Sequence, residues 1–538
     1  MTCAVTLCSA TLGEDGRNEP PLGPLYIAAA LEEIDVEVDF RDFQAEKDSN
    51  GFSGEALARY LSGHEEVVAI SCFVDMLPAV VDAARILHEA RPDTKILIGG
   101  PGPTASARRL LEVYPWISGV VRSEGEETVQ EWIRLLRGDH HGPIPGMIYR
   151  DGARLIDGAE RQRIRNLDQL PRPAYHLIDW KTYTNARVIT TRGCSYRCSF
   201  CDVTALWGTR SVFRSLEATI DEIEMLHDRF GQQTVSIVDD TFVLNRERVT
   251  NFCHKLIERR SNVMWGCFGR INLMTPGLID LMARAGCRAI FYGIDSGSQT
   301  VLDRTVKKVR VEDIVPVLEL SAQYFDRIEA SFIWGYPFET LDDFRMTLDI
   351  AGEASRFAPV VNVQLHMLSP LPLSPIYREF SDQLREPEPE DSRWLLLPGV
   401  LLDKRSEPIR HLVRRDPDIY PGFYTLPTPD KSAKRLQLDR VMKTITQTVG
   451  STVFNSRTNM LVKPETEEGD ASSIEKELLA AHTEPVERIG VGLALGMFRR
   501  ARWGREFRAG RKPFEGTRGA SLVRERPEFA GAQLSTLD

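Results

Sequence analysis

Residues 191–201 read Thr191-Arg192-Gly193-Cys194-Ser195-Tyr196-Arg197-Cys198-Ser199-Phe200-Cys201. Three of the nine cysteines of the chain stand here at Cys-x3-Cys-x2-Cys spacing, directly after a predicted strand. A loop of this length can wrap a metal cluster, and thiolates are the usual ligands of iron–sulfur clusters. Because only three thiols are supplied, a cubane would keep one iron open for another ligand, as catalytic zinc sites do. We therefore predict a [4Fe–4S] cluster on Cys194, Cys198 and Cys201.

Two other interpretations of this loop compete with the cluster. A zinc ion would need a fourth cysteine or histidine at a fitting spacing, and the nearest downstream candidates are His227 and Cys253. Three thiols packed as core residues would be unusual beside Arg192, Ser195 and Arg197. The composition of the loop favours the cluster.

Around this loop, apolar runs of strand length alternate with amphipathic stretches of helix length. The predicted strands are Ala186–Thr190, Val235–Val238, Met264–Cys267, Ala289–Ile294, Ile328–Trp334 and Asn362–Met367. Helices such as Leu216–Arg229 and Arg246–Arg259 separate them. Six such units in residues 181–385 favour a partial (β/α)6 TIM-like barrel over a second open sheet, although periodicity alone does not separate the two.

Residues 1–140 show the same alternation and predict a doubly wound, Rossmann-like parallel sheet, which binds ligands at the carboxyl ends of its strands. The predicted strands are Ala4–Leu7, Val36–Phe40, Val67–Ser71 and Lys95–Ile98. The predicted helices are Leu25–Glu33, Ala56–Leu61 and Ala79–Ala90. The chain is thus α/β through its first two domains.

The rest of the chain divides into a linker and a C-terminal region. Residues 141–180 are rich in Pro, Gly, Arg and Asp, and we interpret them as a linker containing a hairpin whose strands flank Asp151-Gly152. Residues 386–538 alternate helical segments with proline-rich loops and predict a mainly helical region. Within it, Lys463–Ser473 is polar and reads as a mobile link, and Arg499–Arg526 reads as a solvated basic tail.

Composition restricts the function classes. The net charge is −10, which argues against nucleic acid as a partner. No apolar run reaches the roughly 18–20 residues that a membrane span needs, and Met1–Gly13 lacks the features of a signal peptide. Scattered cysteines in odd number do not suggest a disulfide framework. We therefore expect a cytoplasmic protein with no membrane partner, in a compartment where thiols stay reduced.

The cysteine spacing, with the aromatic Phe200 before the third cysteine, resembles the signature of radical S-adenosylmethionine (SAM) enzymes. This resemblance implies that SAM chelates the open iron and that electron transfer from the reduced cluster yields a 5′-deoxyadenosyl radical. Later segments are similar to the SAM-contacting strand ends of that superfamily. The SAM-binding residues implied are Phe200, Asp239, Asp240, Arg270, Gly293, Asp295, Ser296 and Gly335.

Each of these positions also has a structural interpretation. Asp239 and Asp240 could cap a helix, Arg270 could form an ordinary ion pair, and Gly335 could permit a tight turn. Asp295 departs from the family pattern, which has glutamate there, so the shorter side chain puts its contact with the SAM ribose in question. The ordered arrival of all these segments after the cysteine loop favours the SAM site.

The N-terminal 140 residues resemble the cobalamin-binding domain that precedes the barrel in one subfamily of radical SAM enzymes. The cobalamin-binding residues implied are Leu22, Gly23, Ser71, Gly99, Gly100, Pro101, Gly125 and Glu126. No Asp-x-His-x-x-Gly motif follows the first strand, so a histidine ligand to cobalt is not implied. The alternative is a sheet that only shapes the substrate cleft.

These resemblances imply a cobalamin-dependent radical SAM C-methyltransferase acting on an unactivated carbon of a small natural-product intermediate or a peptide. The deoxyadenosyl radical would remove hydrogen, methylcobalamin would supply the methyl group, and flavodoxin or ferredoxin would supply electrons. A non-methylating cyclisation, rearrangement or oxidation is the first alternative. A non-catalytic cobalamin or SAM binding module is the second. The segment that contains Tyr420 and Tyr424 resembles a C-terminal region that closes over the substrate in such enzymes, so both side chains could face the substrate. The other interpretation is that the two aromatic side chains pack against the barrel.

Overall fold

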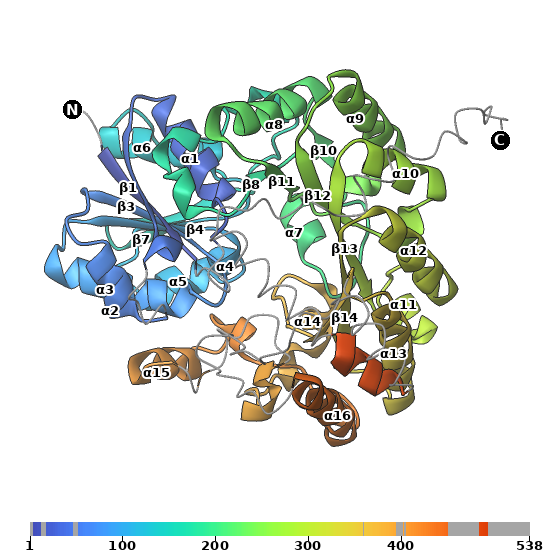
Figure 1. Cartoon of the computed structure of the whole chain (residues 1–538). Helices are drawn as coiled ribbons and strands as arrows, with labels where there is room; N and C mark the ends of the chain where they lie inside the picture. Colours follow the sequence, from blue (N-terminus) through green and yellow to red (C-terminus); the bar gives the residue numbers. More distant parts are fainter. Residues whose placement is uncertain are drawn as a thin grey trace.

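The computed structural model describes residues 4–11, 18–46, 52–358, 360–393, 402, 405–449 and 484–492. They form a seven-stranded sheet, a six-stranded sheet and a two-stranded ribbon, with helices around them (Figure 1). Lys463–Ser473 and Arg499–Arg526 lie outside the described residues. Among the described residues, no helix is both long and apolar enough to cross a bilayer.

The N-terminal sheet has the strand order β2-β1-β3-β4-β5-β6-β7. Its first five strands are parallel: β1 (Ala4–Ala10), β2 (Glu37–Asp42), β3 (Val67–Cys72), β4 (Lys95–Gly99) and β5 (Gly119–Val121). Helices α1 (Leu22–Glu32) and α6 (Glu126–Arg137) cover one face. Helices α2 (Gly54–Tyr60), α3 (Leu77–Ala90) and α5 (Ala107–Val113) cover the other.

Alternation along β1 explains how one strand serves both layers. Val5 and Leu7 pack towards α1 and α6, whereas Cys8 and Ala10 pack towards α2 and α3. The predicted doubly wound sheet is therefore confirmed. The hairpin β6 (Met147–Asp151) and β7 (Arg154–Asp157) forms as predicted, but β6 pairs antiparallel with β5, so the hairpin extends the sheet instead of standing in a free linker.

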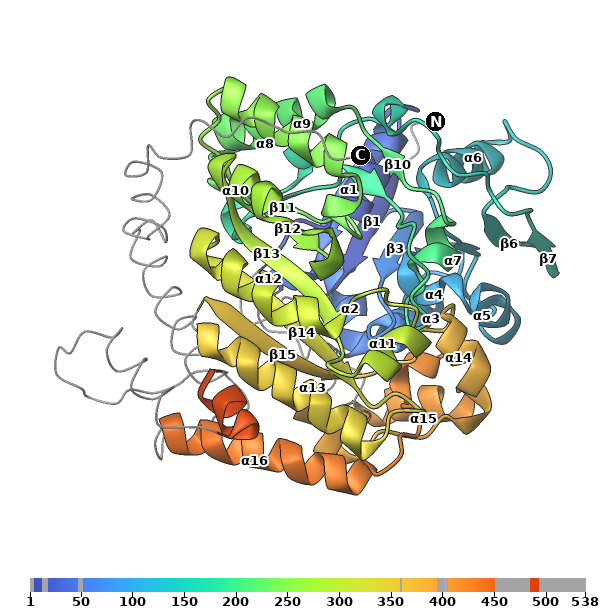
Figure 2. The same cartoon turned by 90° about the vertical axis from the view of Figure 1, so that its right-hand side faces the viewer.

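The second sheet is the predicted partial barrel. Six parallel strands follow the chain order: β8 (Ala186–Val188), β11 (Thr234–Ile237), β12 (Met264–Gly269), β13 (Cys287–Asp295), β14 (Arg327–Trp334) and β15 (Val361–Met367). Five helices cover its outside: α8 (Leu216–Phe230), α9 (Arg246–Glu258), α10 (Pro276–Arg284), α12 (Val311–Tyr324) and α13 (Leu341–Ala354). Figure 2 shows these helices along one side of the curved sheet.

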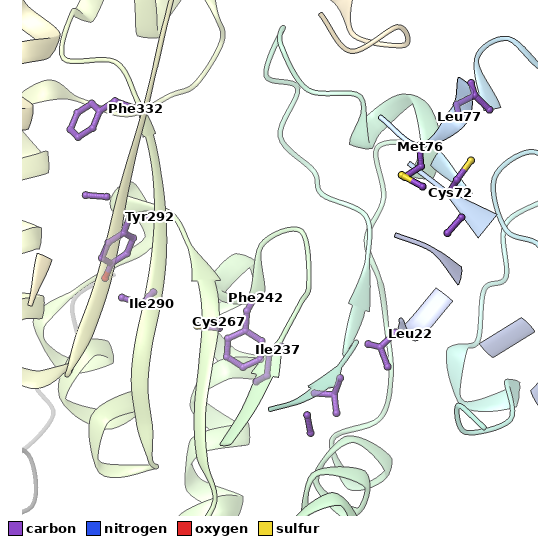
Figure 3. Packing of buried hydrophobic residues seen from close by; sticks show 14 of the residues in the cluster. Leu22, Cys72, Met76, Leu77, Ile237, Phe242, Cys267, Ile290, Tyr292 and Phe332 are labelled. Carbon is purple, nitrogen blue, oxygen red and sulfur yellow. The ribbon is translucent and has the colours of Figure 1, made fainter. Parts of the chain in front are cut away.

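Large aromatic side chains join the barrel strands to their helices. The Trp265 ring lies 5.4 Å from Phe252 of α9, and the Tyr292 hydroxyl lies 2.9 Å from Ser321 Oγ of α12. Figure 3 shows Tyr292 and Cys267 in this buried layer and Cys72 in the N-terminal domain. Alternate residues of the same strands therefore face the concave side, where the strand ends carry the site.

The described C-terminal region is helical, as predicted, and touches both domains. Its helices are α14 (Pro375–Phe380), α15 (Glu407–Arg415) and α16 (Lys431–Val449). Helix α15 packs on α3 of the N-terminal sheet, and α16 packs on α13 of the barrel (Figure 1). The remaining short elements are α4 (Pro101–Thr104), α7 (Val203–Trp207), α11 (Gln299–Arg304) and the ribbon of β9 (Thr191–Arg192) with β10 (Val212–Phe213).

Candidate active site

The three cysteines of the quoted stretch lie in one loop between β9 and α7. Cys194 and Cys198 are each 8% exposed, and Cys201 is half-buried. Across the described residues, no three Cys, His, Asp or Glu side chains come close enough to share a single metal ion. The donor set of three thiols from one loop, without a fourth nearby, fits a cluster that keeps one iron open.

Backbone contacts hold the cysteine loop in place. The loop begins at Gly193, whose φ of 92° favours glycine. The Ser199 N–H donates to the Thr305 carbonyl at 2.9 Å, and the Ser199 carbonyl accepts from the Ile376 N–H at 2.8 Å. The loop is therefore tied to the barrel and to α14, which preorganises the thiols.

The two adjacent aspartates after β11 bind this loop and the strand before it. Asp239 accepts from the Thr190 N–H and hydroxyl, both at 2.6 Å, and from the Thr191 N–H at 2.9 Å. Asp240 accepts from the Gly193 N–H at 2.9 Å, and burial raises its pKa to about 6. They do not cap a helix, so they position the cysteine loop. Their contact with SAM stays a prediction.

Asp239→Ala is expected to destabilise the protein by about 2–4 kcal/mol, because it leaves three buried donors of Thr190 and Thr191 without their acceptor. Urea unfolding followed by circular dichroism measures the change. The exposed Asp280, in an i,i+4 pair with Arg284, provides the control Asp280→Ala, for which we expect less than about 0.5 kcal/mol. Equal losses in the two variants would contradict the positioning role.

Two buried cations lie beside the loop. Arg270, directly after β12, places Nη1 3.6 Å from the Cys198 sulfur and its guanidinium 3.6 Å from the centre of the Tyr196 ring. Arg270 also donates to the carbonyl of Lys307, whose ammonium pairs with Asp295. Lys307 and Asp295 are 5% and 4% exposed. The predicted Arg270 and Asp295 are thus brought together near Cys198 by a lysine that the sequence analysis missed.

Asp295 occupies an unusual backbone position. Its φ is 72°, and the register between β13 and β14 shifts between Gly293 and Asp295. A Cβ on Gly293 would lie 3.2 Å from Lys307 Nζ, so the glycine leaves room for the ammonium. With this space, the Lys307 ammonium pairs with the Asp295 carboxylate, although aspartate is shorter than the glutamate of the family pattern. The hydroxyl of Ser296 lies 3.0 Å from Thr347 Oγ1, and its contact with SAM stays a prediction.

The turn after β14 supplies an unsatisfied buried group. Gly335, with φ of 88°, donates its N–H to Glu339 Oε2 at 2.8 Å. The Tyr336 side chain is fully buried, and its hydroxyl has no hydrogen-bond partner among the described residues. Its ring lies 6.1 Å from the Phe200 ring. A buried hydroxyl left unpaired at this point fits a site that a polar ligand such as SAM would complete.

The residues predicted to contact cobalamin gather where β3 and β4 end and where α1, α4 and α6 begin. They are Leu22, Gly23, Ser71, Gly99, Gly100, Pro101, Gly125 and Glu126. Figure 1 shows α4, at this edge, on the side of the sheet nearest the barrel. An added Cβ on Gly23 would meet nothing within 4 Å. Phe73, which the sequence analysis missed, is 52% exposed directly after β3. Small residues and an exposed ring fit a flat macrocycle.

Two of these residues have structural partners of their own. A Cβ on Gly100, whose φ is 92°, would lie 2.7 Å from the Cys72 carbonyl oxygen, so this glycine lets the ends of β3 and β4 approach. Glu126 accepts from Arg192 Nη2 at 2.5 Å. Its carboxylate therefore reaches towards the cysteine loop, and cobalamin contact by both residues stays a prediction.

The two C-terminal tyrosines both form hydrogen bonds within the protein. Tyr420 is 2% exposed and donates to the Tyr114 hydroxyl at 2.9 Å, and Tyr114 donates to Asp416 at 3.2 Å. The Tyr424 hydroxyl donates to the Val413 carbonyl at 3.2 Å. Tyr420 therefore packs on the N-terminal domain and half-buried Tyr424 on α15, so these hydrogen bonds do not bear out the expected packing against the barrel.

Comparison with known families matches both halves of this arrangement. The profile of the radical SAM superfamily matches residues 188–351, and that of the B12 binding domain matches residues 9–133. An uncharacterized methyltransferase of Pyrococcus horikoshii is 26% identical over 343 residues, covering 62% of this chain and 74% of that protein. The anaerobic magnesium-protoporphyrin IX monomethyl ester cyclase of Cereibacter sphaeroides is 26% identical over 385 residues, covering 68% and 61%.

Solved structures show the same fold at lower identity. The radical SAM methyltransferase TsrM of Kitasatospora setae superposes with a TM-score of 0.59 at 20% identity, covering 76% of this chain and 84% of that one. The cobalamin-dependent radical SAM enzyme OxsB superposes with a TM-score of 0.62 at 19% identity, covering 85% and 69%. These likenesses concern the fold of the chain.

Proposed function

Since this chain belongs to the radical SAM superfamily and carries a B12 binding domain ahead of its barrel, we propose that it is a cobalamin-dependent C-methyltransferase. Its substrate would be a small natural-product intermediate or a peptide with an unactivated carbon. The two domain matches confirm the predicted classes of cofactor: an iron–sulfur cluster, SAM and cobalamin. Methyltransferases among the relatives support the transfer of a methyl group.

The observation that carries the proposal is the contact between the cysteine loop and the cobalamin edge. Arg192, two residues before Cys194, binds Glu124 and Glu126 of the N-terminal domain. The edge predicted to hold cobalamin therefore lies next to the loop predicted to hold the cluster. When bound, the cluster and SAM supply a radical that removes hydrogen, and cobalamin supplies a methyl group. Both cofactors must serve one substrate carbon, and this contact brings their predicted sites together.

The chain's own residues would hold and orient these groups. Cys194, Cys198 and Cys201 would ligate the cluster. Arg270 places positive charge beside Cys198, where the carboxylate of SAM would lie, and Lys307 pairs with Asp295 next to it. The Tyr336 hydroxyl, which has no partner among the described residues, would form one further hydrogen bond to SAM. Burial of these groups excludes water, which protects a radical from side reactions.

A second reaction class is favoured by a specific observation. The magnesium-protoporphyrin IX monomethyl ester cyclase of Cereibacter sphaeroides is a relative named for ring closure. The same domains can therefore serve a cyclisation, and the substrate pocket decides which reaction follows. We further propose a cytoplasmic location and a flavodoxin or ferredoxin as reductant, since a low-potential cluster and free thiols need reducing surroundings.

Anaerobic purification with iron, sulfide and hydroxocobalamin should yield about four irons and about one cobalt per chain, seen by metal analysis and visible absorption. Candidate substrates are then incubated with SAM carrying a deuterated methyl group. A product that gains this methyl group supports the methyltransferase. Four irons without cobalt, or a product without the label, would favour cyclisation, rearrangement or oxidation.

A further inference from the structure

One buried ion cluster joins the two domains at the start of the cysteine loop. Arg192 is 6% exposed, and its guanidinium donates to Glu124 Oε1 at 2.8 Å and to Glu126 Oε1 at 2.5 Å. Both glutamates are themselves buried, at 4% and 5% exposure, and they flank Gly125 at the start of α6. We call these three residues the bridging triad.

Neighbouring side chains enclose the bridging triad on several sides. The Arg192 guanidinium lies 5.4 Å from the centre of the Tyr26 ring of α1 and 5.6 Å from that of Trp207 of α7. Glu124 Oε2 accepts from the Ile164 N–H at 2.8 Å. Arg163 donates to the Arg192 carbonyl at 3.0 Å. The side chain and the backbone of Arg192 are thus both fixed.

Stability alone does not account for this arrangement. Burying one cation with two carboxylates carries a large desolvation cost, and well-packed apolar residues commonly serve a core equally well. Glu126 Oε2 remains buried without a hydrogen-bond partner among the described residues. The two carboxylates do fix an orientation, because a planar guanidinium can donate to two carboxylates in only a few geometries. The triad therefore fixes the placement of two surfaces that apolar contact would allow to slide.

The bridging triad lies between the two predicted cofactor sites. Arg192 is separated from Cys194 by one residue, and Glu126 follows Gly125, a predicted cobalamin contact. A shift of about 1 Å in the alignment of reacting groups can cost about a hundredfold in rate. Residues that set the distance between the two cofactor sites would therefore affect the reaction without touching a substrate.

We propose that Arg192, Glu124 and Glu126 form an interdomain positioning device that fixes the cysteine loop against the cobalamin edge and so sets the separation of the two cofactors. This inference rests on the proposed function for its cofactors. The contacts also lead to a prediction for the protein without cofactors, because they hold residues 191–194 against residues 122–127 whether or not cofactors are bound.

The test compares Arg192→Met and Glu126→Gln with the wild-type holoenzyme. Glu126→Gln is the milder change, because it leaves Arg192 and Glu124 as a neutral pair and so keeps the variant folded. Pulsed electron paramagnetic resonance measures the dipolar coupling between the reduced cluster and cob(II)alamin. We expect the distribution of cluster–cobalt distances to be broader in both variants than in the wild type, and broadest in Arg192→Met. Amide hydrogen exchange at residues 122–127 and 191–194 should become at least about tenfold faster in Arg192→Met.

Arg161→Met is the matched control. Arg161 also binds two glutamates of α6, Glu127 at 2.9 Å and Glu131 at 2.7 Å, with a side chain 9% exposed, but it does not reach the cysteine loop. We expect its distance distribution and its exchange at 191–194 to match the wild type. Unchanged distances and exchange in Arg192→Met and Glu126→Gln, or equal changes in Arg161→Met, would overturn the proposal. If the wild type binds iron without cobalt, the proposed function fails, and the exchange comparison still decides the role of the triad.

Discussion

Replacement of Cys198 by alanine is expected to abolish the reductive cleavage of SAM. Cys198 is the middle thiol of the loop and lies 3.6 Å from Arg270 Nη1. Its loss removes one of the three ligands that the loop supplies to the cluster. Iron per chain should fall well below the wild-type value of about four, and 5′-deoxyadenosine formation with dithionite should fall at least about a thousandfold. Liquid chromatography of the nucleoside products measures the cleavage.

Cys253→Ala is the control for the loss of a buried thiol. Cys253 lies on α9, is fully buried in the barrel core and is not part of the cysteine loop. It should lose some stability, about 1 kcal/mol, because a small cavity forms, while iron content and SAM cleavage stay at the wild-type level. SAM cleavage by Cys198→Ala at a wild-type rate would contradict the role of this loop as the cluster site. No SAM cleavage by the wild type, with cofactor binding unchanged in Cys198→Ala, would favour a non-catalytic binding module.

The fold could be predicted in most of its parts because runs of strand length alternate with runs of helix length. Val67–Ser71 is almost wholly apolar, which is typical of a parallel strand covered by helices on both faces. Ile328–Trp334 instead carries Glu329 and Ser331 between apolar residues and was recognised from its length and its position between predicted helices. The hairpin at Asp151-Gly152 was found from its turn residues. Its place at the edge of the first sheet depends on the pairing of β5 with β6, which no local pattern specifies.

The site was predictable where short motifs carry it and not where distant segments meet. The cysteine loop and Arg270 stand in recognisable local sequence. Lys307 joins Asp295 only through the bulge in β13, and nothing in Lys307-Lys308 distinguishes one lysine from the next. The contact of Arg192 with Glu126 spans 66 positions along the chain. Such pairs are consequences of tertiary packing, so sequence periodicity carries no signal for them.

A buried lysine from the C-terminal helix supports the turn beside the predicted SAM site. Lys434 of α16 is fully buried and donates to Glu339 Oε2 at 2.9 Å, to the Glu339 carbonyl at 2.7 Å and to Thr428 Oγ1 at 2.8 Å. The same carboxylate accepts from the Gly335 N–H. The C-terminal region is thus linked to the Gly335 turn through one ion pair, which is fully enclosed.

Lys434→Met is expected to destabilise the protein by about 3–5 kcal/mol at pH 8, because Glu339 is left buried without its cation. Burial already raises the pKa of Glu339. A carboxyl whose pKa in the folded state exceeds its unfolded value binds more protons when folded, so stability rises as the pH falls through the folded pKa towards the unfolded one. The loss in Lys434→Met should therefore shrink towards pH 5. Guanidinium unfolding at several pH values measures it.

The double variant Lys434→Met with Glu339→Gln separates charge from packing. The glutamine keeps an acceptor for the Gly335 N–H and removes the unpaired charge, so most of the lost stability should return and the pH dependence should disappear. If the turn positions SAM, affinity for SAM measured anaerobically by equilibrium dialysis should fall in the single variant and recover in the double variant. A double variant as unstable as the single one would mean that the lysine stem, through its packing against the turn, matters more than the pairing of charges.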